Sequence, residues 1–124
     1  MFENYKYKTW ELYGTKVLAI ILPTRQEDLI SIIINEFNGQ VEGLLECVNK
    51  VLSGESEEES AGHNDEYFII HKDVTTAYDD LASLNNENLE EGEEPDVEEV
   101  DIPTLRLKEI LEDYIAEKEK LGIK

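Results

Sequence analysis

Apolar residues recur at helical spacing through residues 24–52. Successive intervals of four, three, four, three, four and three separate Ile30, Ile34, Phe37, Val41, Leu44, Val48 and Val51. This pattern is the stripe that a helix buries along one side. Thr24, with Glu27 three positions later, forms a capping box at the start, and Gly54 marks the end. The segment is therefore predicted to be the core helix of the protein.

Glycine interrupts this helical pattern near its middle. Asn38-Gly39 and Gly43 lie there, and a glycine inside a helix costs about 1 kcal/mol relative to alanine. An unbroken helix would extend about 40 Å at 1.5 Å per residue, which is long for a domain of this size. We expect a kink or a short break that leaves two helical arms, over residues 25–37 and 40–52.

Strand-forming residues dominate five other segments. Residues 5–12 and 16–22 predict an N-terminal hairpin, and the continuous apolar run in the second of them is typical of a strand covered on both faces. Residues 66–71 and 73–80 predict a second hairpin. A short extended segment over residues 97–102 adds a further strand.

A second amphipathic helix is predicted over residues 105–120. Thr104 is suited to the N-cap position. The residues that follow at helical spacing are Leu107, Ile110, Leu111, Tyr114, Ile115 and Lys118. The order of elements predicts an α+β fold, in which a small, mostly antiparallel sheet packs against the long kinked helix and this C-terminal helix.

Length and composition are typical of a single domain. The chain has 124 residues, of which 40% are hydrophobic, and this is enough to build one core. Two acidic segments, at about 54–65 and 84–98, contain few apolar groups and have the composition of loops. We expect one domain over residues 1–124 with these two loops on its surface.

The charge of the chain is strongly negative. Thirty acidic residues against eleven basic ones give a net charge of −19, and eighteen of the acids lie between residues 55 and 101, where there is one lysine. Such a field repels nucleic acids and anionic membranes and attracts basic proteins. Because the chain has neither a signal-peptide pattern nor an apolar run of about 20 residues, we expect a cytoplasmic protein that binds neither nucleic acid nor membrane directly.

Candidate catalytic groups are few. His63 and His71 are the histidines of the chain, and neither has a second histidine at metal-ligand spacing. Cys47 lies beside the apolar stripe and is more typical of an inert, buried thiol than of a nucleophile. The glutamate runs do not have the spacing of a calcium loop. We therefore expect no metal, no cofactor and no enzymatic activity, although carboxylates alone can catalyse hydrolysis.

Several short motifs lie between residues 51 and 118. They are VLSGE at 51–55, Gly62 with Asn64, EYFIIH at 66–71, KDVT at 72–75, and VDIPT at 100–104 leading into LKEIL at 107–111. In this combination the chain resembles immunity proteins of bacterial polymorphic toxin systems, including those of contact-dependent growth inhibition. It departs from their pattern at His63, which separates the glycine from the asparagine, and at Tyr114, where tryptophan is more frequent.

The resemblance implies a small cytoplasmic immunity protein. Such a protein binds and neutralises the C-terminal toxin domain of a cognate polymorphic toxin, and these toxins are often nucleases, whose basic surfaces would complement the acidic charge. The alternative is a different class, namely an acidic adaptor or regulatory domain, or a nucleic-acid mimic, that docks another basic protein. A neighbouring gene for a large secreted protein with a basic C-terminal domain would favour the first of these.

Candidate toxin-binding residues come from the two acidic runs and from the hairpin between them. Carboxylates would attract the partner, and two tyrosines would supply desolvated contacts. The set is Glu57, Glu58, Glu59, Asp65, Glu66, Tyr67, Tyr78, Asp79, Asp80, Glu90, Glu91, Glu93, Glu94, Asp96, Glu98 and Glu99. The sequence predicts no oligomeric state.

Overall fold

The computed structural model describes residues 4–37 and 40–123. Within these residues the chain forms β1 (Lys6–Leu12), β2 (Thr15–Ile21), α1 (Asp28–Phe37), α2 (Val41–Leu52), β3 (Glu59–Gly62), β4 (Glu66–Ile70), β5 (Val74–Asp79), α3 (Asp80–Glu87), β6 (Glu99–Pro103) and α4 (Thr104–Lys120). The described strands form a two-stranded sheet, β1-β2, and a four-stranded sheet, β3-β4-β5-β6, and both are antiparallel. The α+β class is confirmed.

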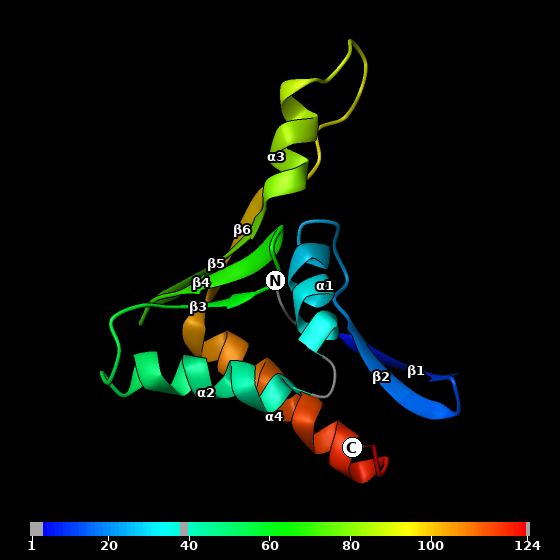
Figure 1. Cartoon of the computed structure of the whole chain (residues 1–124), viewed down its shortest axis with the longest axis vertical. Coiled ribbons are helices and arrows are strands. Elements are labelled where there is room, and N and C mark those ends of the chain that lie inside the picture. Colours follow the sequence, from blue (N-terminus) through cyan, green and yellow to red (C-terminus); the bar gives the residue numbers. More distant parts are fainter. Residues whose placement is uncertain (1–3, 38–39, 124) are drawn as a thin grey trace.

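The four-stranded sheet has two different faces. Three helices pack against the strands on one face: α1 contacts all four strands, α2 contacts β3 and β4, and α4 contacts β5 and β6 (Figure 1). This core face carries Phe68, Ile70, Ala77 and Ile102, each fully buried. Because strand residues alternate between faces, the opposite face carries Ser60, Tyr67, Ile69, Thr76, Tyr78, Glu99 and Asp101. We call this second set the open face.

The predicted core helix is present as α1 and α2. Its stripe is buried at Ile30, Ile34, Val41, Leu44, Val48 and Val51, whereas Phe37 at the end of α1 is half-buried. Helix α2 continues through Gly43, so the break is not at that glycine. The predicted break at Asn38-Gly39 lies outside the described residues.

Hydrogen bonds of Thr24 and Glu27 precede helix α1. The Thr24 hydroxyl accepts from the Glu27 backbone N–H at 3.2 Å and donates to Glu27 Oε1 at 2.6 Å. The segment from Thr24 to Glu27 is a turn, and the regular helix begins at Asp28. The two residues therefore contact each other at the entry to the helix, but the prediction that the helix begins at residue 25 is wrong, because residues 24–27 form a turn before it.

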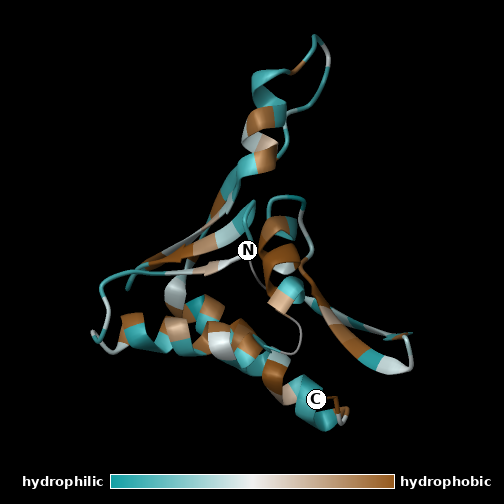
Figure 2. Ribbon diagram, in the orientation of Figure 1, coloured by the Kyte–Doolittle hydropathy of each residue, from teal (hydrophilic) through white to brown (hydrophobic). Residues whose placement is uncertain are grey.

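The N-terminal hairpin forms a sheet of its own instead of joining the four-stranded sheet. Its turn is Tyr13-Gly14, with φ of +50° and +77°, which is the conformation of a tight two-residue turn between twisted strands. Strand β2 packs on α1, and Figure 2 shows hydrophobic residues along both elements. The edge of β2 that faces away from β1 is hydrogen-bonded by side chains from helices.

Three side chains hydrogen-bond the edge of β2 that faces away from β1. Asn35 accepts from Ile20 N at 2.9 Å and donates to Ile20 O at 2.9 Å. Ser31 Oγ accepts from Leu22 N at 3.0 Å, and the Tyr114 hydroxyl donates to Leu18 O at 2.7 Å. Backbone groups that would be costly to bury unpaired are thereby satisfied.

Helix α4 begins one residue earlier than predicted, and its N-cap differs. The N-cap is Pro103, which makes no side-chain cap, and Thr104 is the first helical residue. The buried Thr104 hydroxyl instead donates to His71 O at 2.5 Å and lies 2.9 Å from Thr75 Oγ1. The assignment of Thr104 as N-cap is therefore wrong, because the hydroxyl is used to tie the helix to β5 and to the turn before it.

Both acidic segments contain regular structure that the sequence analysis did not predict. Residues 59–62 form strand β3, which pairs with β4, and residues 84–87 belong to helix α3. The loop prediction is therefore wrong at these positions. Among the described helices, none combines the length and the apolar character needed to cross a membrane.

Candidate functional site

Two tyrosines stack on the open face. Tyr67 and Tyr78 are opposite each other in the β4-β5 register, with ring centroids 5.5 Å apart and planes inclined by 26°. Gly62 faces Tyr67 from β3, and a Cβ there would lie 2.5 Å from Tyr67 Cα. The absence of a side chain at Gly62 is what allows β3 to approach so closely. The result is a half-buried aromatic pair on the two middle strands, one residue from the ends of β4 and β5 that adjoin α3.

Carboxylates border this aromatic pair. Glu99 is opposite Tyr78 in the β5-β6 register, and Asp101 accepts from the Thr76 hydroxyl at 2.6 Å. Asp80, at the start of α3, accepts from the Tyr67 hydroxyl at 3.2 Å. Desolvation and the adjacent Asp80 carboxylate both raise the pKa of Tyr67. The tyrosines therefore have acidic groups on the sides toward β6 and α3.

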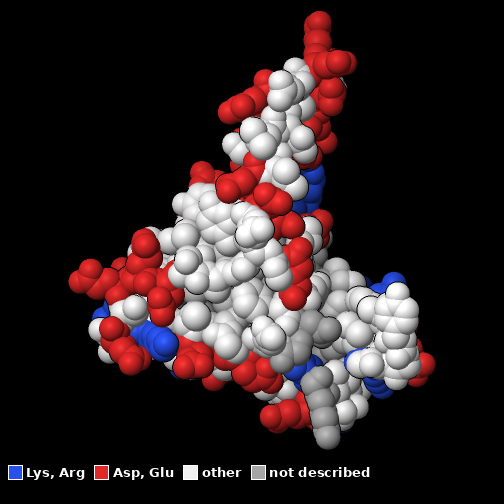
Figure 3. Space-filling view, viewed as in Figure 1, with Lys and Arg blue, Asp and Glu red and all other residues white. Residues whose placement is uncertain are grey.

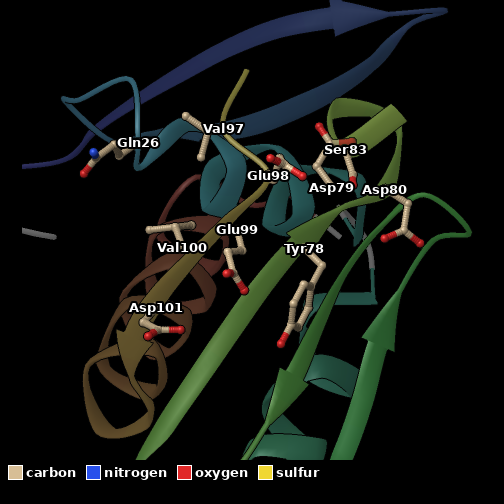
Figure 4. Close-up of a pocket in the computed structure, with 10 residues that line it drawn as sticks. All are labelled: Gln26, Tyr78, Asp79, Asp80, Ser83, Val97, Glu98, Glu99, Val100 and Asp101. Carbon is tan, nitrogen blue, oxygen red and sulfur yellow. The ribbon is translucent and has the colours of Figure 1, made fainter. Parts of the chain in front are cut away.

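A hollow of about 720 Å³ lies where the open face meets α3 (Figure 4). Its lining residues are Gln26, Tyr78, Asp79, Asp80, Ser83, Val97, Glu98, Glu99, Val100 and Asp101. Five of these were in the predicted set, whereas Gln26, Ser83, Val97, Val100 and Asp101 were not. Asp101 lies within the predicted strand over residues 97–102, and the alternation of that strand places it on the same face as Glu99.

Helix α3 and the segment that returns from it to β6 project from the sheet as an arm (Figure 1). The Asp79 side chain caps the helix by accepting from Ala82 N at 3.0 Å. Asn86 donates to Asp96 O at 2.9 Å and accepts from Asp96 N at 2.8 Å, which joins the helix to the returning segment. Hydrogen bonds from Asn86 and Ser83 lower the pKa of Glu98. We define the arm as residues 80–98.

The far part of the arm carries the second predicted acidic run. Glu90, Glu91, Glu93 and Glu94 are all exposed, and Figure 3 shows acidic side chains along the arm and at its end. Arg25 lies beside this segment, where it donates to Pro95 O at 2.8 Å and lies 3.7 Å from Glu94. The arm is therefore anchored to the segment before α1 as well as to the sheet.

Apart from the acids that follow α3 on the arm, the predicted acids form two groups at opposite ends of the four-stranded sheet. Glu59 pairs with Ile70 at one end of β4, and Glu58 lies 2.7 Å from the His71 imidazole there. The group at the other end, next to the arm, consists of Asp65, Glu66, Asp79, Asp80, Glu98 and Glu99. β4 has five residues, so its ends are about 13 Å apart at ~3.3 Å per residue. The prediction did not distinguish these ends.

Glu66 differs from the other predicted acids because it lies at the edge of the core face. It is half-buried, and it hydrogen-bonds Glu36 of α1. Desolvation raises the pKa of Glu66, and the negative charges of Glu36 and Asp79 raise it further. This carboxylate is therefore better explained by the packing of α1 on β4 than by partner binding.

Glu66→Gln should change the pH dependence of stability. The folded-state pKa of Glu66 is raised above its ordinary value of 4.5. The stability of the wild type relative to the variant is therefore greatest below that pH. This relative stability is lost as the pH rises through the folded-state pKa. Urea unfolding at pH 4 and pH 7 should show a wild-type advantage that shrinks at pH 7. Glu119→Gln on the exposed side of α4 is the control, and an equal pH response in both variants would contradict the assignment.

The three groups considered as catalytic candidates differ in their surroundings, since Cys47 is half-buried whereas each histidine lies beside a glutamate. Burial raises the pKa of the Cys47 thiol, which makes it less reactive at neutral pH. His63 lies 3.5 Å from Glu36, and His71 contacts Glu58. Within residues 4–37 and 40–123, the His, Cys, Asp and Glu side chains form no group of three or more that could hold a metal ion.

Comparisons with known proteins add nothing to these geometric observations. No protein family model, no curated protein and no solved structure matches this chain.

Proposed function

We propose that this protein is an immunity protein that binds and neutralises the cationic C-terminal domain of a cognate polymorphic toxin, a nuclease. Eighteen acids between residues 55 and 101 supply a long-range attraction for such a partner. The carboxylates would occupy the cationic groove of the toxin domain that otherwise receives the phosphate backbone of the nucleic acid. Binding would take place in the cytoplasm of the cell that makes the protein.

The observation that carries this proposal is the arrangement of the open face. The stacked Tyr67 and Tyr78 have carboxylates on two sides, namely Asp80 toward α3, and Glu99 and Asp101 toward β6. Stable protein interfaces have this composition, with aromatic groups in the centre and polar groups at the rim. The tyrosines would provide contacts that lose water on binding, and the acids would orient the basic partner.

Co-expression with the toxin domain encoded beside this gene tests the proposal. Growth of a sensitive host should be restored by the wild-type protein and lost with Tyr67→Ser/Tyr78→Ser, because serine removes the aromatic contacts. Tyr13→Ser is the matched control, since Tyr13 is 99% exposed at the tip of the hairpin. Growth that is equally poor with and without the wild-type protein, when both proteins are expressed, would refute the immunity function.

A further inference from the structure

Helix α3 exposes two neighbouring leucines. Leu81 and Leu84 are 51% and 56% exposed, and residues three apart lie side by side on a helix. On the other side of α3, Ala82 is buried, and Asn86, one turn later, hydrogen-bonds Asp96 of the returning segment. The helix is therefore anchored through its Ala82–Asn86 side, and the two leucines point away from that anchor.

The leucines continue the surface of the stacked tyrosines. The Tyr67 hydroxyl donates to Asp80 at 3.2 Å, so the side of α3 that carries Asp80 is turned toward the open face. Leu84 follows Asp80 by four residues and lies on the same side of the helix. Figure 2 shows hydrophobic residues on α3, and Figure 3 shows uncharged surface along the arm between acidic groups.

The acids around the leucines define the chemistry of the occupant. Asp80 and Glu87 are one turn from Leu84 on either side, and the exposed Glu90 and Glu91 follow closely. An anionic or purely apolar partner would meet this border of carboxylates unfavourably, whereas a cationic one would be attracted. Charge complementarity therefore selects a basic protein surface with an apolar centre.

We propose that Leu81 and Leu84 form a docking strip, continuous with Tyr67 and Tyr78, for an apolar spot ringed by lysine or arginine on a cationic protein. This rests on the proposed function and deepens it, because it extends the desolvated contacts of that interface from the two tyrosines to the arm. Apolar groups buried at the centre of an interface mainly slow dissociation, whereas the surrounding charges mainly set the association rate.

The test uses the cationic toxin domain encoded beside this gene, immobilised for binding kinetics. Leu81→Ser/Leu84→Ser should raise the Kd by at least about tenfold, mostly through faster dissociation. Leu81→Met/Leu84→Met, which keeps apolar volume, should restore tight binding. The matched control is Leu12→Ser/Leu105→Ser, since these leucines are 52% and 64% exposed but lie on β1 and α4.

The outcomes separate this inference from the function on which it rests. If the wild type binds and the Leu81→Ser/Leu84→Ser variant binds with the same rates, the docking strip is refuted and the immunity function remains. If the wild type does not bind, both the function and the strip are refuted. Equal weakening by the Leu12→Ser/Leu105→Ser control would also refute the strip, because the effect would then not be specific to the arm.

Discussion

Leu44→Ala is expected to lower the free energy of unfolding by about 2–5 kcal/mol, because it removes buried methyl groups and leaves a cavity. Leu44 is fully buried in α2, within the cluster that includes Val48 and Phe68. Phe37→Ala should lower the free energy of unfolding by less than truncation of a fully buried phenylalanine would, since Phe37 is half-buried at the end of α1. Urea unfolding followed by circular dichroism measures both changes.

The control for this prediction is a leucine on the surface. Leu105→Ala removes the same groups from a side chain that is 64% exposed, and its effect should stay within about 0.5 kcal/mol. An unfolding midpoint for Leu44→Ala that matches the wild type would show that the apolar stripe of α2 does not carry the core.

Reversing acids beside the open face should slow association with the toxin domain. Glu90→Lys/Glu91→Lys/Glu99→Lys changes the charge of the arm and of β6 by six units, and the association rate constant should fall by about tenfold at low salt. The salt dependence should flatten as well, because screening acts on the long-range attraction that the acids provide. Stopped-flow mixing at several salt concentrations measures both effects.

The two ends of the sheet provide the matched control for that experiment. Glu46→Lys/Glu55→Lys/Glu57→Lys introduces the same change of charge on α2 and on the loop before β3, away from the arm. When the two variants are compared at 0.1 M salt, its effect on association should be clearly smaller, because the Debye length there is about 10 Å. Equal slowing by both variants would indicate that net charge, and not the acids next to the open face, attracts the partner.

Periodicity in the sequence was sufficient for the main elements. The 3-4 spacing from Ile30 to Val51 identified α1 and α2, and β-branched and aromatic residues identified the strands of both hairpins. These signals are local, since each residue contributes to the element that contains it. Fold class followed from their order.

Strand β3 and helix α3 could not be predicted in the same way. Glu59-Ser60-Ala61-Gly62 has no apolar alternation and is extended because it pairs with β4, which is a tertiary effect. Helix α3 did leave a signal, namely the Asp79 cap and the spacing of Leu81 and Leu84, but the surrounding acids and asparagines outweighed it. Composition is a poor guide where a short helix is anchored by hydrogen bonds such as Asn86 to Asp96.

The candidate site was predicted as a set of residue types and not as an arrangement. The sequence indicated acids and tyrosines between residues 57 and 99, and the fold brings Tyr67, Tyr78 and Asp80 together. It also separates Glu58 from them, because the register of β3 on β4 places the neighbouring Glu59 opposite Ile70, at the end of β4 away from Tyr67. Register is fixed by pairing between strands, and a single sequence carries little information about it.

The hydrogen bonds along the edge of β2 match one turn of helix α1 to the two-residue repeat of the strand. Ser31 and Asn35 are one helical turn apart and bond Leu22 and Ile20, which are two strand residues apart. Four helical residues rise about 6.0 Å and two strand residues about 6.6 Å, so the mismatch reaches ~1.2 Å by a third position. The next carbonyl, that of Leu18, is bonded by Tyr114 of α4. A further step of four residues from Asn35 would lie beyond the end of α1 at Phe37, so a second helix completes the edge that one strand would otherwise pair.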